Sequence, residues 1–245
     1  MTSTSKARVA YLASGSGSTV ESNSKACFRG DIPADPVVVI ANNGSAGVLK
    51  RAENLGIPTR LFRFYRDFHG DEDAYGDAIL RALEEFDVDF VGQLGWMLLT
   101  PRKVVEAYLG RIWNQHPGPL DPPNHADFGG QGMHGKRVHH ARMLYCRWFE
   151  LPEEEHWTEA TSQLVSPEYD RGDLLLTRRV PILPTDEVED LQERVLPVEH
   201  HVQIETLRGL IDGTITPFQR EDRLVPDDRA EILTNIKKIA VLMHP

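Results

Sequence analysis

The stretch RVAYLASGSGST, residues 8–19, decides the fold that we expect for this chain. Its first half is a short apolar run, and its second half, residues 14–19, contains only serine, glycine and threonine. A buried strand that leads into a tight turn has this pattern, because glycine gives the backbone the freedom that the turn needs. We therefore predict a strand, a Gly/Ser turn and then a helix.

Strands and helices alternate along the first half of the chain. Apolar runs predict further strands at residues 36–41, 59–62, 88–94 and 111–114. Helices are expected from about 46 to 55 and from about Asp71, where apolar residues recur every three or four positions. This alternation is typical of a parallel, doubly wound α/β sheet. Because ligands bind beyond the carboxyl ends of such strands, the turns after residue 13 and after Trp113 are expected to face one crevice.

The second half has a different pattern. Residues 117–135 are rich in proline, glycine, asparagine and aspartate and predict a long irregular loop, which in a compact domain is usually functional. A helix over 138–149, strands at 161–165 and 174–180 around a loop at 166–172, and a helical stretch over 187–211 follow. Pro197 is expected to kink or split that last helix. The polar segment after Gly213 supports no assignment.

Composition limits the classes of function. The 245 residues carry 27 Lys+Arg and 37 Asp+Glu, a formal net charge of −10, which disfavours binding to nucleic acid. No apolar run approaches the roughly 18 residues of a membrane span, and the amino terminus lacks an apolar signal core. Cys27 and Cys146 are too few for a disulfide framework. We expect a cytoplasmic protein, a single domain over 1–245, that acts on small molecules without nucleic-acid or membrane partners; its oligomeric state stays open.

The Gly/Ser turn is a candidate anion site. Glycines let backbone N–H groups approach an anion, and the start of the following helix adds the positive end of its dipole. The turn is not a dinucleotide fingerprint, because Val20 stands at the third glycine position, and it lacks the Gly-Lys-Ser/Thr of a nucleotide triphosphate loop. A plain turn without a ligand is the alternative interpretation.

Asn114 and His116 form a second candidate. They lie two residues apart on an extended segment, so both side chains point the same way. An amide beside an imidazole suits the stabilisation of a developing oxyanion, although a surface turn with polar residues has the same pattern. Asp170 can orient an imidazole or relay a proton through water. Alternatively, it is a turn residue that pairs with Arg171 or caps backbone N–H groups.

A metal site is not expected. The histidines at 125, 134, 139 and 140 match no zinc spacing, and only Cys146 lies near them. Loop histidines are the simpler interpretation. Glu199 and His200, on the late helix, are ambiguous in isolation.

Taken in order, these segments resemble the folate-dependent formyltransferases over residues 7–211, and within them the branch that acts on glycinamide ribonucleotide. The motifs that carry the resemblance are SGSGST (14–19), NNGSAG (42–47), LGWM (94–97), NQHP (114–117), FGGQGM (128–133) with His139, YDRG (169–172) and EH (199–200). Each motif is weak alone, but seven in the right order and spacing are a specific signal.

The resemblance implies a formyltransferase fold, a Rossmann-like, mostly parallel sheet flanked by helices, with an antiparallel addition in the C-terminal half. It also implies transfer of a formyl group from the co-substrate 10-formyltetrahydrofolate to a primary amine, that of glycinamide ribonucleotide in purine biosynthesis, without a metal. Another small amine, such as an amino sugar or a hydroxyornithine, or water as in formyltetrahydrofolate hydrolases, remains an alternative acceptor. A non-catalytic binding protein with the same fold is a further alternative.

The resemblance also implies roles for individual residues. Asn114 and His116 would polarise the formyl carbonyl, and Asp170 would orient His116 or a water and pass the proton. Glu199 would bind the ribose hydroxyls. The substrate phosphate would be held by Gly15, Ser16, Gly17, Ser18 and Thr19. The pterin would be clasped by Trp96, Met97, Leu98, Leu99, Val165 and Tyr169.

The sequence departs from the family pattern at several positions. Thr19 replaces the usual asparagine, and Leu98-Leu99-Thr100-Pro101 follows Met97 where a basic residue is common. Gly118-Pro119-Leu120-Asp121 replaces the usual Ser-Leu-Leu-Pro after His-Pro. Residues 144–156 align poorly. The expected domain has an amino-terminal tail at 1–7 and an extension over about 213–245, past the usual end of the family.

Overall fold

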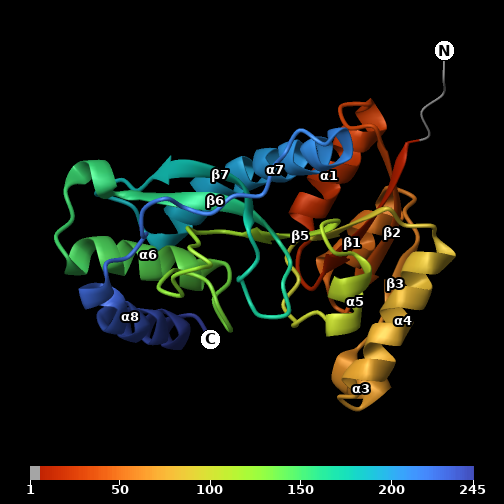
Figure 1. The fold of residues 1–245 in the computed structure, drawn as a ribbon, viewed down its shortest axis with the longest axis horizontal. Helices are drawn as coiled ribbons and strands as arrows, with labels where there is room; N and C mark the ends of the chain where they lie inside the picture. The colour runs from red at the N-terminus through yellow and green to blue at the C-terminus, as the bar shows by residue number, and fades with distance from the viewer. Residues whose placement is uncertain (1–5) are drawn as a thin grey trace. The chain divides into compact units, whose positions relative to one another are not determined.

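The structure of the protein is a computed structural model that describes residues 6–245 (Figure 1). Most of the expected amino-terminal tail, residues 1–5, lies outside the described residues, and the first strand begins at Ala7. The chain divides into two compact units. Unit 1 comprises Met1–Gln115 and Gln203–Ile215, and unit 2 comprises His116–Val202 and Thr216–Pro245.

Unit 1 contains the parallel part of the sheet. Its strands are β1 (Ala7–Ala13), β2 (Ala34–Ala41), β3 (Thr59–Leu61), β4 (Phe90–Gln93) and β5 (Ile112–His116), the last of which ends at the first residue of unit 2. Leu12 aligns with Ile40 on one side and with Gln93 on the other, and Gln93 aligns with Asn114. The carboxyl ends of β1, β4 and β5 therefore lie at the same edge of the sheet, as the alternation of elements predicts.

Five helices accompany these strands: α1 (Ser18–Arg29), α2 (Gly47–Asn54), α3 (Phe64–Phe68), α4 (Glu72–Glu85) and α5 (Arg102–Ala107). The clearest predicted helix, α4, is capped by Asp71, whose side chain accepts the Ala74 N–H at 3.0 Å. Its expected apolar face is buried. Helices α3 and α5 were not expected, because a helix of five or six residues has too few turns to show a period.

Unit 2 contains the antiparallel pair β6 (Trp157–Leu164) and β7 (Leu174–Pro181). Its helices are α6 (Lys136–Trp148), the first part of α7 (Val188–Asp212) and α8 (Ala230–Met243), with short 3-10 turns η1 (Glu153–Glu155) and η2 (Asp227–Arg229). Residues 117–135 contain no helix or strand, as expected for a long loop. The core joins side chains from α6, α7 and α8, including Val138, Leu191 and Ile236.

The strand order of the whole sheet is β3-β2-β1-β4-β5-β6-β7. This confirms the predicted mostly parallel sheet with an antiparallel addition. Two predictions need correction. Strand β6 begins at Trp157, four residues before the expected start at Thr161. Helix α7 continues through Pro197 as one helix, so the expected split is wrong, whereas the alternative, a kink at Pro197, stays a prediction. Among residues 6–245, no helix has the length and apolar character of a membrane span.

Candidate active site

The Gly/Ser turn of unit 1 is built around Gly17. Its backbone has φ of +75°, in the left-handed region, and α1 begins at the next residue. An added Cβ at this position would lie 2.5 Å from the Val48 Cβ and 2.7 Å from its Cα, so only glycine allows α2 to approach the turn this closely. Gly15 and Ser16 are exposed, whereas Thr19 is buried in the first turn of α1. The accessible backbone of the turn therefore belongs to its first half.

Helix α2 anchors the turn and brings a cation to it. The Val48 N–H donates to the carbonyl of Gly15 at 3.2 Å, and Arg51 Nε donates to the carbonyl of Ser16 at 3.0 Å. The Arg51 guanidinium also pairs with Glu21 of α1. Sequence analysis did not single out Arg51 as a neighbour of this turn, since a lone arginine in a short helix carries no motif. Its charge adds to the positive end of α1 at this turn.

The segment after β4 is joined directly to the turn. The N–H of Ser14 donates to the carbonyl of Gly95, and the N–H of Met97 donates to Oγ of Ser14, both at 2.9 Å. Trp96 is buried, whereas Met97 and Leu99 are exposed and Leu98 is half-buried. Unit 1 thus places exposed apolar side chains next to the Gly/Ser turn.

Strand β5 contains both Asn114 and His116, and the boundary between the two units falls between Gln115 and His116. Asn114, in unit 1, is half-buried, and His116, the first residue of unit 2, is 3% exposed. Side chains two residues apart on a strand point to the same face. The amide and the imidazole therefore lie on one side of β5, as the sequence predicts.

His116 and Asp170 lie together in unit 2. Nδ1 of His116 is 3.6 Å from Oδ2 of Asp170, and its Nε2 is 3.2 Å from the carbonyl oxygen of Phe128. A carbonyl oxygen only accepts hydrogen bonds, so Nε2 carries the hydrogen. A second proton on the ring then sits on Nδ1, where it faces the carboxylate. The pair can hold a positive charge on the imidazole.

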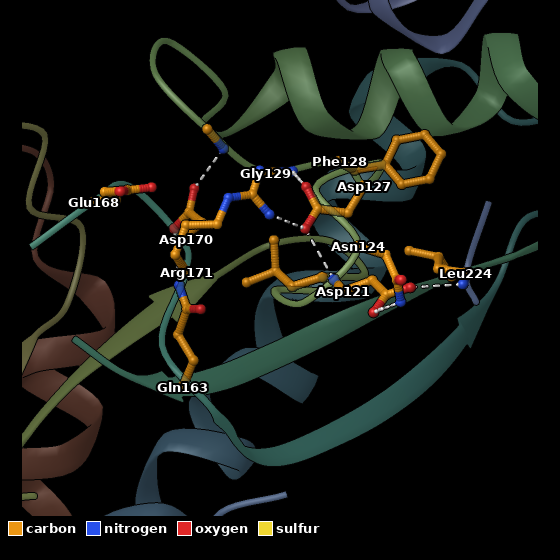
Figure 2. A network of polar contacts seen from close by, with 12 residues as sticks. Asp121, Asn124, Asp127, Phe128, Gly129, Gln163, Glu168, Asp170, Arg171 and Leu224 are labelled. Atoms are coloured by element: carbon orange, nitrogen blue, oxygen red, sulfur yellow. Dashed lines mark hydrogen bonds and ion pairs between the residues drawn. The ribbon is translucent and has the colours of Figure 1, made fainter. Parts of the chain in front are cut away.

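Three groups among the described residues contact the Asp170 carboxylate, and Figure 2 labels one of them, Gln163. The N–H of Gly130 donates to Oδ2 and Gln163 Nε2 donates to Oδ1, each at 2.8 Å, while His116 faces Oδ2. Asp170 has φ of +55°, a backbone conformation that aspartate tolerates better than most residues. Gln163 was missed in the sequence, where its only signal is a polar residue at a buried strand position.

The 117–135 loop is held by buried carboxylates rather than by regular structure (Figure 2). Asp127 is fully buried and accepts the N–H of Gly129 at 3.0 Å, the N–H of Asp121 at 2.9 Å and Arg171 Nη1 at 2.9 Å. The alternative pairing of Arg171 with Asp170 is therefore wrong, because Arg171 pairs with Asp127. Asp170 does accept a backbone N–H, but it also faces the imidazole, which a turn residue need not do.

The histidines of this region belong to unit 2, and the pKa values of two of them, His134 and His139, are lowered. Burial lowers the pKa of His139 to about 4, and the charge of His116 adds to this effect. Burial also lowers the pKa of His134, with smaller contributions from Arg137 and His116. Among residues 6–245, no three histidine, cysteine, aspartate or glutamate side chains are grouped as metal ligands.

Comparison with known proteins identifies the family. The formyl transferase family model matches residues 7–207. The chain belongs to the formyl transferase family.

Named relatives agree with this placement. The chain is 32% identical over 208 residues to the chloroplastic phosphoribosylglycinamide formyltransferase of Vigna unguiculata; the match covers 85% of this chain and 62% of that protein, so the chain spans less than two thirds of that relative. A glycinamide ribonucleotide transformylase structure from Symbiobacterium toebii is similar with a TM-score of 0.72 and 27% identity, covering 86% of this chain and 90% of that one. The phosphoribosylglycinamide formyltransferase structure from Brucella melitensis has a TM-score of 0.70 and 30% identity, covering 87% and 100%.

The residues predicted for the formyltransferase site fall into two groups, one in each unit. Unit 1 contains the Gly/Ser turn, residues 96–99 and Asn114. Unit 2 contains His116 and the remaining predicted residues, namely Val165, Tyr169, Asp170 and Glu199. Val165 and Tyr169 are half-buried beside Asp170 in the β6–β7 loop, and Glu199 is a buried residue of α7.

Proposed function

We propose that this formyltransferase moves the formyl group of 10-formyltetrahydrofolate to the primary amine of glycinamide ribonucleotide, a step of purine biosynthesis. The observation that carries the proposal is the His116–Asp170 pair, in which Nδ1 of His116 is 3.6 Å from Oδ2 of Asp170. His116 is the last residue of β5 and lies two residues after Asn114. The relatives named for this reaction support the choice of substrates.

The reaction needs charge stabilisation and proton transfer. The neutral amine nitrogen attacks the formyl carbon, whose oxygen becomes an oxyanion. In this proposal the Asn114 amide donates to that oxyanion, and a positive charge on the His116 imidazole, balanced by Asp170, stabilises it electrostatically. Asp170, through a water, takes the proton from the attacking nitrogen and delivers it to N10 of the folate. The bond between the formyl carbon and N10 then breaks, giving formylated amine and tetrahydrofolate.

No metal is required, because a neutral amine is already nucleophilic and the oxyanion has donors of its own. We propose that this activity is cytoplasmic and uses small-molecule substrates. The formal net charge of −10 disfavours a nucleic-acid partner. We also propose that 1–245 acts as a single formyltransferase-like domain. Both β5 and α7 run from one unit into the other, which supports this.

Each unit has its own proposed substrate contacts. The exposed backbone at Gly15 and Ser16, the start of α1 and the Arg51 guanidinium suit a phosphate group. Glu199 is proposed to bind the ribose hydroxyls. The pterin is proposed to contact the apolar residues Trp96, Met97, Leu98, Leu99, Val165 and Tyr169.

The test is an acceptor series with purified chain and 10-formyltetrahydrofolate, in which tetrahydrofolate formation is followed. Glycinamide ribonucleotide is expected to give rapid turnover, and glycinamide without the ribose phosphate much less. Turnover with an amino sugar or hydroxyornithine, and none with glycinamide ribonucleotide, would support the alternative acceptor that Thr19 and the altered 118–121 segment suggest. Equal consumption of the donor without any amine would identify a hydrolase instead.

A further inference from the structure

Residues 216–245, the carboxyl-terminal segment, lie beyond the family match and fold into unit 2. Helix α8 of this segment packs against α6 (Figure 1). Its buried side chains Leu233, Ile236 and Ala240 belong to the same hydrophobic core as Val138 of α6. The segment is therefore an integral part of unit 2, and a shared core fixes its position beside the 117–135 loop.

The start of the carboxyl-terminal segment bonds to the first part of that loop. Arg220 Nε donates to the carbonyl of Leu120 at 2.7 Å, and the N–H of Leu224 donates to Oδ2 of Asp121 at 2.8 Å. Asp121 is fully buried and stands where the formyltransferase pattern has proline. This contact therefore needs both the altered loop and the added segment.

Lys237 of α8 reaches the second part of the loop. Its Nζ donates to the carbonyl oxygen of Asp127 at 3.1 Å and to that of Gly129. Burial lowers the pKa of this ammonium, as does Arg171, while the carboxylates of Asp127 and Asp170 act in the opposite direction. A partly buried ammonium is costly unless its donors are used, so this one is held in place by the carbonyls it binds.

The backbone that Lys237 holds is the backbone that orients the catalytic pair. The two bound carbonyls flank Phe128, whose own carbonyl oxygen lies 3.2 Å from Nε2 of His116. The next residue, Gly130, donates its N–H to Oδ2 of Asp170 at 2.8 Å. The Lys237 ammonium is thus three covalent or hydrogen-bonded steps from each member of the pair.

We propose that Lys237 is a positioning residue for formyl transfer, acting through the backbone of residues 127–130 on His116 and Asp170. The inference rests on the proposed function of the same site. Lys237 touches neither member of the pair, and the proposed phosphate contacts lie in unit 1. Its loss should therefore slow the chemical step without weakening substrate binding.

Steady-state kinetics of Lys237→Met test whether the chemical step slows while substrate binding stays the same. The variant is expected to lower kcat about 10–100-fold, with the KM of both substrates within about twofold of wild type. The matched control is Lys238→Met, the exposed neighbour on the same helix, which should leave both constants unchanged. Lys237→Arg keeps the cation and its donors, so its kcat should exceed that of Lys237→Met. A wild-type kcat for Lys237→Met, or a change confined to KM, overturns the inference.

A second measurement does not depend on activity. In protein labelled with ¹⁵N-histidine, the ring nitrogen signals of His116, assigned with His116→Gln, should shift in Lys237→Met and not in Lys238→Met. The signals of exposed His69, in unit 1, should stay in place, and far-UV circular dichroism reports whether the variant is folded. If Lys237→Met does not fold, Lys237→Arg takes its place in the same comparison. Unmoved His116 signals in the folded variant contradict the inference, whereas a shift together with an inactive wild type refutes only the proposed function.

Discussion

The loop that follows β1, in unit 1, and the loop that follows β5, in unit 2, are stabilised in different ways. The turn after β1 is short and is held by hydrogen bonds to Ser14, Gly15 and Ser16, one of them from the Arg51 guanidinium, and Gly17 allows the close approach of α2. The loop after β5 is long and is held by buried charged groups, among them Asp127 and Lys237. The first loop should therefore respond to steric changes, and the second to changes of charge and pH.

The largest expected effect comes from the buried charge in the long loop. Asp127→Ala removes the acceptor of two backbone N–H groups and of Arg171, so we expect it to lower the free energy of unfolding by about 4 kcal/mol. Urea denaturation measures this loss. In unit 1, Glu53→Ala removes an exposed pair with Lys50 and should leave the unfolding midpoint unchanged. Equal losses of unfolding free energy in the two variants would show that the buried carboxylate stabilises the protein no more than the exposed one.

Acid should destabilise unit 2 through His139. Its pKa is about 4 in the folded chain against 6.5 for a free side chain, so between these values the unfolded chain binds a proton that the folded chain does not. This linkage removes about 3 kcal/mol of stability as pH falls from 6.5 to 4, and nothing above pH 6.5.

Unfolding of His139→Phe across that pH range checks the effect, because the variant should lack this part of the acid loss. The matched control is His69→Gln, at the one histidine of unit 1, which is exposed. The His69→Gln variant should keep the wild-type dependence of the unfolding free energy on pH. An unchanged acid slope in His139→Phe would contradict a neutral, buried His139.

The short turn should respond to volume instead. Gly17→Ala and Gly30→Ala both force a positive φ on alanine, with φ of +75° and +84°, but only position 17 has a neighbour within 4 Å. We expect Gly30→Ala to cost about 1 kcal/mol and Gly17→Ala about 2 kcal/mol more, from its contact with Val48. Thermal or urea unfolding of the two variants measures the difference. Equal costs would mean that α2 can move away from the turn.

Sequence patterns predict unit 1 better than unit 2, for a physical reason. The apolar run before Ser14 and the apolar period after Asp71 are local signals, and the strands and helices they predict are present. The pairing of Arg171 with Asp127 depends on chain segments far apart in sequence, and propensity carries no information about it. Helix α8 was missed, although its buried residues Leu233, Ile236 and Ala240 recur at helical spacing in the sequence.

The same distinction holds for the site. His116 and Asp170 could be predicted because each lies in a short motif, and the structure brings them together. Gln163, Arg51 and Lys237 could not, because a single polar residue on a strand or helix has no pattern until its neighbours are known. The contacts that support the proposed catalytic pair form only in the folded chain, whereas the motifs that contain His116 and Asp170 are visible in the sequence.

The central claim is that the His116–Asp170 pair carries out formyl transfer, and turnover of Asp170→Asn tests it most directly. Asparagine fits the same space and tolerates the positive φ, so the fold should be retained while the negative charge is lost. We expect Asp170→Asn and His116→Ala each to lower turnover of glycinamide ribonucleotide at least about 100-fold. Glu168→Gln, an exposed residue of the same loop, should not. Wild-type rates in the folded Asp170→Asn and His116→Ala proteins would contradict the account.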